Sequence, residues 1–350
     1  MRALAILTVK NEAAFLLEWL AHHRAVGFSD FLVFSNDCSD GTDALLDRLQ
    51  ALGELTHVRN PGPWREGPQW AALKAADRHP LTRAADWVLV SDIDEFVNIH
   101  VGDGTLAALT AALPEATAIA LTWRLFGNAG VVDFHDAPVT AQFTRAAPAG
   151  MIWPWRASLI KTLFRNDGAY GKLGVHRPRA PDPDRMARTV WVDGSGRVLP
   201  DSYRTGRLFT PLGEDPWQMV QLNHYALGSM QGYVLKCDRG RANRDASTFD
   251  LSYWVERNFC DVEDRTISRY ADATAAGIAR LRADPEIDRL HLAGVAWRQA
   301  RFAALMAEEP FRALFGRLML TPPSRPLPPP LAARMRALAV AAATKATAED

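Results

Sequence analysis

The chain has 350 residues, and 40 Lys and Arg balance 40 Asp and Glu, which gives a formal net charge of zero. This balance argues against a general nucleic-acid binder, which would be strongly basic, but it allows a local basic pocket. Three widely spaced cysteines without a CxxC pair exclude a disulfide framework and a zinc ribbon, and they favour a reducing, cytoplasmic location. We expect neither a transmembrane helix nor a signal peptide, because the apolar runs are too short.

Strand and helix patterns alternate over residues 1–122. Apolar runs of strand length lie at 4–9, 31–35, 55–58, 87–91 and 118–122. Apolar residues at helical spacing predict helices at 12–26, about 40–52, about 68–78 and 105–113. This alternation implies parallel pairing with right-handed crossovers, and therefore an α/β fold. In such sheets a ligand binds beyond the carboxyl ends of the strands.

The pattern changes after Trp123. Residues 123–225 are rich in Pro, Gly, Trp and Arg, which predicts loops and short antiparallel strands at the edge of the sheet. Helical patterns return at 232–242, 252–258 and about 263–307. A Pro-rich linker then precedes an Ala-rich segment, which is either an amphipathic helix or a frayed tail.

These patterns divide the chain into three parts. We expect the main domain over 1–245, a helical C-terminal extension over 246–320, and the Pro-rich linker with the Ala-rich tail over 321–350. Peripheral contact of the tail with the inner face of a membrane is left open.

The segment Ser91-Asp92-Ile93-Asp94-Glu95 carries three carboxylates directly after an apolar strand. Carboxylates this close repel one another unless a cation or hydrogen-bond donors hold them. Mg²⁺ and Mn²⁺ bind carboxylate oxygens and leave positions open for phosphate oxygens. A solvated turn or a helix N-terminus would also explain this segment.

Two further polar loops follow predicted strands, Lys10-Asn11-Glu12 after the first and Asn36-Asp37-Cys38-Ser39-Asp40 after the second. Asn11 is a good N-cap for the helix that follows, and Asp40 suits the same task in the next helix. Capping alone would explain both residues. Alternatively, these side chains could bind a nucleobase or a ribose.

Together, the three loops resemble those of the GT-A glycosyltransferases. More narrowly, they are similar to the glycosyltransferase family 2-like bacterial group and to the family 92 proteins that share the Asp-x-Asp-Glu-Phe block, here residues 92–96. The resemblance covers roughly residues 3–245, with further similar blocks at 161–165, 172–178, 223–225 and 236–240. It implies a Rossmann-like, mostly parallel sheet flanked by helices, with a helical C-terminal extension.

The resemblance also implies a nucleotide-sugar donor, with UDP or GDP as the nucleotide, and a glycan acceptor. Lys10, Asn11 and Glu12 would line the nucleotide. Asn36 and Asp37 would face the base and ribose, although family 2 more often has Asp where Asn36 stands, so Asp37 is the alternative contact. Asp92 and Asp94 would hold Mn²⁺ or Mg²⁺ on the diphosphate, with Asp92 also next to the nucleotide.

His224 would be a further metal or diphosphate ligand, because GT-A enzymes often supply a C-terminal histidine there. A hydrogen-bonded structural role is the alternative for His224, and His176 is the rival ligand. Lys236 and Arg239, with Arg241, either neutralise the leaving diphosphate or form a solvated basic face.

An inverting transferase needs a carboxylate within hydrogen-bond distance of the acceptor hydroxyl. Glu214 and Asp215 resemble the pair that supplies this base in family 2, and Glu95 is a second candidate by its proximity to Asp94. A surface turn would equally explain Glu214 and Asp215. Trp123, like Trp153 and Trp155, would either stack on a sugar ring or belong to the core.

We therefore expect a metal-dependent hexosyltransferase of polysaccharide biosynthesis that acts on a glycan or glycoconjugate hydroxyl. We expect it to be inverting, and non-processive because the Gln-x-x-Arg-Trp motif of processive synthases is missing. A non-catalytic carbohydrate- or nucleotide-binding protein on the same scaffold is one alternative. A nucleotidyltransferase or phosphohydrolase is the other, although the chain lacks a Gly-rich phosphate loop.

Overall fold

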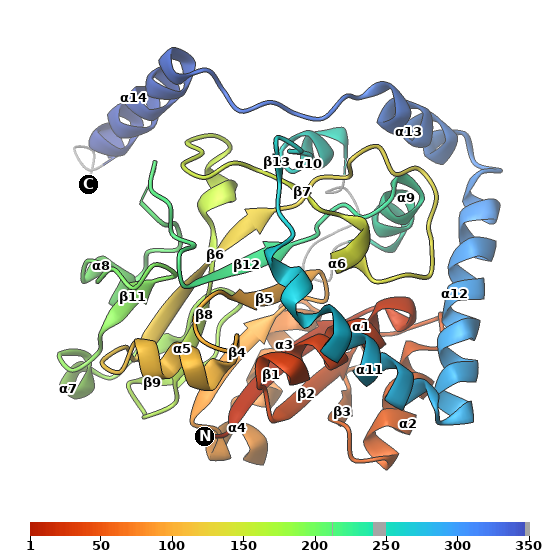
Figure 1. Cartoon of the computed structure of the whole chain (residues 1–350), viewed down its shortest axis with the longest axis horizontal. Helices are drawn as coiled ribbons and strands as arrows, with labels where there is room; N and C mark the ends of the chain where they lie inside the picture. The colour runs from red at the N-terminus through yellow and green to blue at the C-terminus, as the bar shows by residue number, and fades with distance from the viewer. Residues whose placement is uncertain (212, 241–249, 347–350) are drawn as a thin grey trace.

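The computed structural model describes residues 1–211, 213–240 and 250–346 (Figure 1). A nine-stranded sheet forms its centre, in the order β3-β2-β1-β4-β8-β6-β12-β5, with β11 paired to β6. Five of its eight strand pairings are parallel, so the sheet is mostly parallel, as expected. The strands of this sheet are β1 (Ala3–Val9), β2 (Asp30–Ser35), β3 (Thr56–Arg59), β4 (Trp87–Ser91), β5 (Glu95–Ile99), β6 (Ala118–Leu125), β8 (Ile160–Arg165), β11 (Trp191–Asp193) and β12 (Val220–His224).

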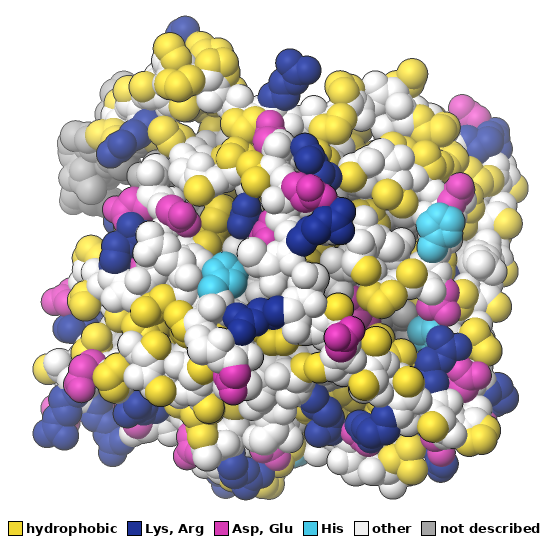
Figure 2. Space-filling model, in the orientation of Figure 1, with side chains coloured by type: hydrophobic (Ala, Val, Ile, Leu, Met, Phe, Trp, Pro, Cys, Tyr) yellow, Lys and Arg dark blue, Asp and Glu magenta, His cyan; other side chains and the backbone are white. Residues whose placement is uncertain are grey.

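Helices flank this sheet, and short ribbons lie outside it. The helices of the first 225 residues are α1 (Ala13–Val26), α2 (Thr42–Ala51), α3 (Pro68–Ala76), α4 (Pro80–Ala84), α5 (Leu106–Ala112), α6 (Val139–Gln142), η1 (Trp155–Ser158), α7 (Pro183–Met186) and α8 (Ser202–Thr205). Two two-stranded ribbons pair β9 (Tyr170–Lys172) with β10 (Arg179–Pro181), and β7 (Arg145–Ala146) with β13 (Val262–Glu263). On the face shown in Figure 2, basic and acidic side chains are interspersed, in keeping with the balanced charge.

Strand β1 shows why both faces of the sheet are covered. Its side chains alternate, so that Ala5 and Leu7 join the core that contains α1, whereas Leu4 and Ile6 join the core that contains α3. All four are completely buried. A continuous apolar strand of this kind is typical of a parallel sheet between two helical layers.

The predicted elements of the first 122 residues are present within a few residues of their expected ends, and Gly27 terminates α1 at a φ of +108°. The capping prediction for Asn11 is wrong. Asn11 has a φ of +55° and precedes the N-cap, which is Glu12. The first free N–H groups of α1 instead bond to Asp40 and Thr42 from the neighbouring loop, and this contact joins the ends of β1 and β2.

The middle of the chain corrects a second prediction. The apolar run that contains β8 does not lie at the edge of the sheet, because β8 pairs antiparallel with both β4 and β6. Strand β12 is also internal, between β6 and β5. Strand β5 itself was not predicted. A tight turn, closed by a 3.1 Å hydrogen bond from Glu95 N to Asp92 O, separates it from β4.

The C-terminal part is helical, as expected. Its helices are α9 (Met230–Arg239), α10 (Leu251–Val255), η3 (Thr266–Tyr270), α11 (Ala271–Arg282), α12 (Pro285–Leu305), α13 (Glu309–Leu320) and α14 (Pro329–Ala346). The helical stretch predicted over about 263–307 consists of η3, α11 and α12, and Asp284 caps α12 while Pro285 opens it. The Ala-rich tail is a helix over its described part. The predicted boundary between 245 and 246, like Arg241, lies outside the described residues.

Helices α11 and α12 pack directly on α1, and in Figure 1 α11 lies in front of the sheet and α12 at its right side. Glycines permit this close approach. A Cβ atom added at Gly294 would lie 2.5 Å from the Cβ of Ala13, and one added at Gly277 would lie 2.8 Å from that of Ala21. Within the described ranges, no helix combines the length and the apolar character needed to span a membrane.

Candidate active site

The candidate site lies where β4, β5 and β12 meet. The turn between β4 and β5 carries Asp92 and Asp94, and the register of β12 sets His224 opposite Glu95. The Tyr225 N–H donates to the Asp94 carbonyl oxygen over 2.8 Å, which fixes the end of β12 against the turn. The sheet thereby brings His224 next to Asp94, although the two are far apart in the sequence.

Asp94 contacts a cation and an imidazole. Its Oδ2 lies 2.8 Å from Nζ of Lys236 on α9, and its Oδ1 lies 3.7 Å from Nε2 of His224. Burial alone would raise the pKa of the Asp94 carboxyl, but Lys236 and His224 outweigh it and hold that pKa well below its usual range. Asp94 is therefore ionised at neutral pH. Lys236 Nζ also donates to the Ala226 carbonyl oxygen over 2.7 Å.

His224 is the predicted histidine that reaches the acidic turn. It is only 3% exposed, and its ring packs on Trp123 with 4.0 Å between the ring centroids. Burial lowers the pKa of His224 to about 3, so the imidazole is neutral at pH 7. Its buried Nδ1 has no hydrogen-bond partner among the described residues. His176 instead donates from Nδ1 to the Ile160 carbonyl oxygen over 3.0 Å.

Lys161 on β8 is the second cation of the site. It is completely buried, and its Nζ lies 2.9 Å from Asp92 Oδ2 and 3.4 Å from Glu95 Oε2. Sequence analysis noted the block that contains Lys161 but gave this residue no role. A lysine inside the apolar run of β8 was the available signal, because an unpaired lysine is almost never fully buried.

Glu95 is not placed to act as a base. It is fully buried, and its carboxylate accepts hydrogen bonds from Trp123 Nε1 at 2.7 Å and from Asp92 N at 2.9 Å. Burial raises the pKa of Glu95, and the Lys161 ammonium opposes that rise. A general base must reach the acceptor hydroxyl. Glu95 instead braces the turn, and Trp123 is a packed part of the site.

The two nucleotide loops contact each other. Asn36 is completely buried, where its amide donates to the Val9 carbonyl oxygen over 3.0 Å and accepts from Asn60. Asn11 accepts from the Ser39 N–H over 2.7 Å. Asp37, in contrast, is exposed at the end of β2, with a φ of +44°. Of the two residues predicted to face the base and ribose, Asp37 therefore has the accessible side chain.

Glu12 and Arg239 join α9 to the loop after β1. They form an ion pair, and Arg239 also donates to the Lys10 carbonyl oxygen over 3.0 Å. Both side chains line the same pocket as Asp94 and Lys236. The structure therefore gathers five predicted residues around one cavity: Asn11, Glu12, Asp94, Lys236 and Arg239.

The Glu214–Asp215 pair lies elsewhere. Glu214 is exposed, pairs with Arg197 at 2.9 Å and lines a second cavity of about 360 Å³, whose wall includes Trp123. Asp215 accepts from the Trp217 N–H over 3.2 Å and does not line that cavity. Within the described ranges, neither carboxylate is hydrogen-bonded or ion-paired to Asp92, Asp94 or His224.

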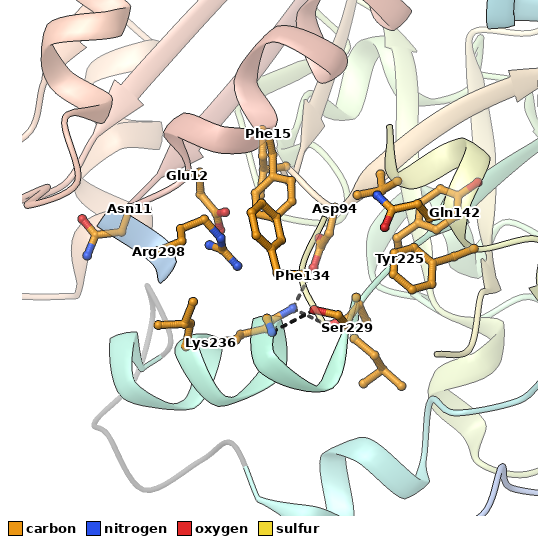
Figure 3. A pocket seen from close by; sticks show the side chains of 18 of the residues that line it. Asn11, Glu12, Phe15, Asp94, Phe134, Gln142, Tyr225, Ser229, Lys236 and Arg298 are labelled. Atoms are coloured by element: carbon orange, nitrogen blue, oxygen red, sulfur yellow. Dashed lines mark hydrogen bonds and ion pairs between the residues drawn. The ribbon is translucent and has the colours of Figure 1, made fainter. Parts of the chain in front are cut away.

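The main pocket holds about 850 Å³ of space beside Asp94 (Figure 3). It lies between the start of α1, the loop before α6, the start of α9 and helix α12. Its polar side chains extend from Asn11, Glu12 and Arg298 on one side to Asp94 on the other, and Phe15 and Phe134 lie between them. Sequence analysis missed Phe134, Phe15 and Arg298, because nothing distinguishes them from ordinary core and surface residues.

The described side chains form no group of three or more His, Cys, Asp or Glu that could by itself hold a metal ion. Asp94 and His224 do suit a divalent cation, because Asp94 is ionised and His224 is neutral, with its Nε2 facing the carboxylate at 3.7 Å. Mg²⁺ is usually bound by one or two carboxylates and completed by substrate phosphates and water. These residues therefore fit a cation shared with a diphosphate.

A mostly parallel α/β sheet with an Asp-x-Asp turn at its strand ends defines a GT-A scaffold. The sequence model of glycosyltransferase family 92 matches residues 5–193, more than half of the chain, so the protein belongs to glycosyltransferase family 92. The sequence resembles both the family 2-like group and family 92, and the sequence model that matches is that of family 92.

Among curated proteins, the chain is similar to two plant members of the family. It is 26% identical to a family 92 protein of Ricinus communis over 147 residues, which are 38% of this chain and 24% of that protein. It is 24% identical to one of Oryza sativa subsp. japonica over 139 residues, which are 39% of this chain and 23% of that protein. The matches thus span about a quarter of these relatives.

Among solved structures, S. aureus TarS (residues 1–349) is 14% identical, with a TM-score of 0.34 over 86% of this chain and 92% of that one. The same protein in complex with UDP is 13% identical, with a TM-score of 0.36 over the same shares. These scores are too low to place ligands in the present chain.

Proposed function

We propose that the protein transfers a sugar from a nucleotide-sugar to a hydroxyl of a glycan or glycoconjugate. One observation carries the proposal: Asp94, His224 and Lys236, from three separate segments, meet at the carboxyl edge of the sheet beside a pocket. Ligands of open α/β sheets bind at this edge. Membership of family 92 supports sugar transfer as the reaction.

The donor would bind across the ends of β1, β2 and β4. We assign the base and ribose to the exposed Asp37, and the diphosphate to the region between Asp94 and Lys236. A UDP- or GDP-sugar would therefore have its nucleotide at Asp37 and its diphosphate between Asp94 and Lys236. The buried Asn36 would support Asp37 by holding the two loops together.

A Mn²⁺ or Mg²⁺ ion would be held by Asp94 and His224, with Asp92 on the other side of the turn. When bound, such an ion offsets the charge that develops on the leaving diphosphate. Lys236 already contacts Asp94 and could donate to the same phosphate oxygens. Positioned cations of this kind stabilise the transition state more than the ground state.

In an inverting, non-processive transfer, the acceptor hydroxyl attacks the anomeric carbon, the bond to the diphosphate breaks, and a base accepts the hydroxyl proton. Glu214 remains the proposed base because it lines the cavity on the other side of Trp123, and Asp215 remains the alternative. Glu214 pairs with Arg197 at 2.9 Å, so the acceptor would have to displace that contact.

A non-catalytic binding protein is the second candidate, and one observation favours it. Lys161 and Lys236 already neutralise Asp92 and Asp94, so the acidic turn is satisfied without a metal ion. Such a protein would bind a nucleotide or a carbohydrate and release no product.

The test is turnover of UDP- and GDP-sugars by the wild type and by Asp94→Asn, measured as released nucleoside diphosphate with Mn²⁺ and with EDTA. We expect Asp94→Asn to lower turnover at least about 100-fold, beyond the usual loss for an outer-shell change at a metal site. Its thermal unfolding should stay close to that of the wild type. Asp184→Asn, on exposed helix α7, is the matched control.

Full turnover in EDTA would contradict the metal requirement. Nucleotide binding without release of product from any donor would favour the binding protein instead.

A further inference from the structure

The pocket beside Asp94 is too apolar for a sugar alone. Rings and aliphatic side chains form most of its wall, and these are Phe15, Ile93, Phe134, Val139, Phe143, Tyr225, Leu227, Leu235 and Trp297. Hydroxyl groups placed against such a wall would lose their hydrogen bonds to water. The pocket therefore suits a ligand with a substantial apolar part (Figure 3).

Five charged residues line the pocket, and Arg298 is the one that packs between aromatic rings. Arg298 comes from α12, is 6% exposed, and has its guanidinium 4.6 Å from the ring centre of Phe15 and 5.0 Å from that of Phe134. Among the described residues, no carboxylate lies within ion-pair distance of Arg298, although the charge of the buried Asp40 acts on it from farther away, and its buried Nε has no hydrogen-bond partner. The neighbouring cations Lys236 and Arg239 are paired with Asp94 and Glu12.

Without a ligand, the burial of the Arg298 guanidinium lowers the free energy of unfolding. Burial lowers the pKa of Arg298 to about 10, which still leaves the guanidinium charged at neutral pH. A buried charge without an ion-pair partner destabilises a fold, even where aromatic rings offset part of the loss. An anionic group of a ligand would compensate the charge, and a guanidinium can donate two parallel hydrogen bonds to a phosphate or a carboxylate.

We propose that this pocket binds the acceptor, and that the acceptor carries a phosphate or carboxylate bound by Arg298 next to an apolar group packed on Phe15 and Phe134. This inference rests on the proposed function, because Asp94 at the polar end of the pocket marks where the sugar is transferred. It adds the chemical class of the acceptor: a glycoconjugate whose sugar is joined through an anionic group to an apolar one.

The position of the pocket favours the acceptor over the donor. Asp37, Asn60 and Gly62, which form the proposed nucleotide end, do not line it, and only Asn11 and Glu12 of the nucleotide loops reach its wall. Arg298 lies on α12, in the C-terminal part of the chain, and the adjacent wall runs along α9 as far as Arg239. Donor and acceptor would thus approach Asp94 from opposite sides of the turn.

The test is calorimetric binding of phenyl phosphate, compared with phenol and with inorganic phosphate, without any donor sugar. We expect the wild type to bind phenyl phosphate at least tenfold more tightly than either fragment, and Arg298→Met to lose that advantage. Arg298→Lys, which keeps the charge but loses the fork of donors, should be intermediate. Arg289→Met, at an exposed position of the same helix, is the control.

Thermal unfolding separates a ligand site from a structural role. Arg298→Met should unfold at the same or a higher temperature, because it removes a buried charge and keeps an apolar chain between the rings. A lower unfolding temperature with unchanged phenyl phosphate binding would overturn the proposal. Displacement of phenyl phosphate by UDP would also overturn it, because Arg298 would then serve the donor. Arg298-dependent binding in a protein that never releases nucleotide would support the anion site while contradicting the transferase activity.

Discussion

Lys161 joins two carboxylates, the buried Glu95 and the partly exposed Asp92. Its ammonium lies between Asp92 and Glu95 and is completely buried. Replacing Lys161 by Met should lower the free energy of unfolding by about 3–5 kcal/mol, the usual result of removing one partner from a buried ion pair. Urea unfolding at pH 7 measures this loss.

A second change provides the control for Lys161. In the double variant Lys161→Met with Glu95→Gln, a neutral amide replaces the buried carboxyl that has lost its cation, so part of the stability should return. Equal stability of the single and double variants would show that Glu95 does not need the ammonium.

Asp37 is the accessible side chain of the second nucleotide loop. Asp37→Ala should weaken UDP or GDP binding by about 1–3 kcal/mol, because hydrogen-bonding groups of the nucleotide would be left without a partner. Calorimetry with the nucleoside diphosphate measures this change, and Asp201→Ala at an exposed turn is the control. Unchanged affinity would restrict Asp37 to shaping the loop.

For single residues, the sequence predicts which residue types lie at the candidate site, but not which of their polar atoms remain available to a ligand. The Asp-x-Asp turn and His224 could be expected from their motifs, and the structure brings Asp94 and His224 within 3.7 Å. Asn36 looked equally suited to a ligand, yet both ends of its amide are used inside the protein. Such pairing depends on residues far along the chain, which local spacing does not reveal.

Among the elements, the first half of the sheet was predictable because each strand is followed by its own helix. The position of β8 in the sheet was predicted wrongly, because β8 is not followed by a helix of its own. Its two neighbours, β4 and β6, are distant in sequence, and its antiparallel direction follows from the long path before it. Strand β5 was hidden because the tight turn with three carboxylates looks like a loop.

Helix α1 carries a pH-sensitive contact with β5. His22 is buried, its Nε2 lies 2.8 Å from the Val97 carbonyl oxygen, and burial lowers its pKa to about 4. The unfolded chain binds this proton near pH 6.5, so stability is full above that pH and falls as the pH drops from 6.5 toward 4. The loss from this residue should be on the order of 3 kcal/mol.

Urea unfolding at pH 7 and pH 4.5 tests this contact. His22→Gln should be less stable than the wild type at pH 7, but it should lose less on acidification. His23 is buried on the same helix with a pKa that burial also lowers, so part of the pH dependence should remain. An identical acid-induced loss in both proteins would contradict the role of His22.

At the scale of the whole molecule, the C-terminal helices differ in how they are held. Helix α12 packs on α1, α2 and α9, and Arg48 pairs with Asp284 at its start. Helix α14 exposes Leu331 and Leu338 and lies away from the sheet (Figure 1). The two should therefore contribute very differently to stability.

Two truncations test this difference. A chain that ends after residue 327 should keep its unfolding temperature within about 2 °C, because single surface contacts contribute little. A chain that ends after residue 284 should lose cooperative unfolding, since α1 would then expose the surface that α12 covers. A large loss from the shorter deletion would show that α14 is part of the folded unit.

The family match ends at residue 193, before β12, α9 and α12 begin. The loops proposed for the donor therefore belong to the shared part of the lineage, whereas the cavity wall with Arg298 comes from a region outside it. With the proposed acceptor site, a change in α12 alone would alter which molecule receives the sugar, while the nucleotide loops stay as they are.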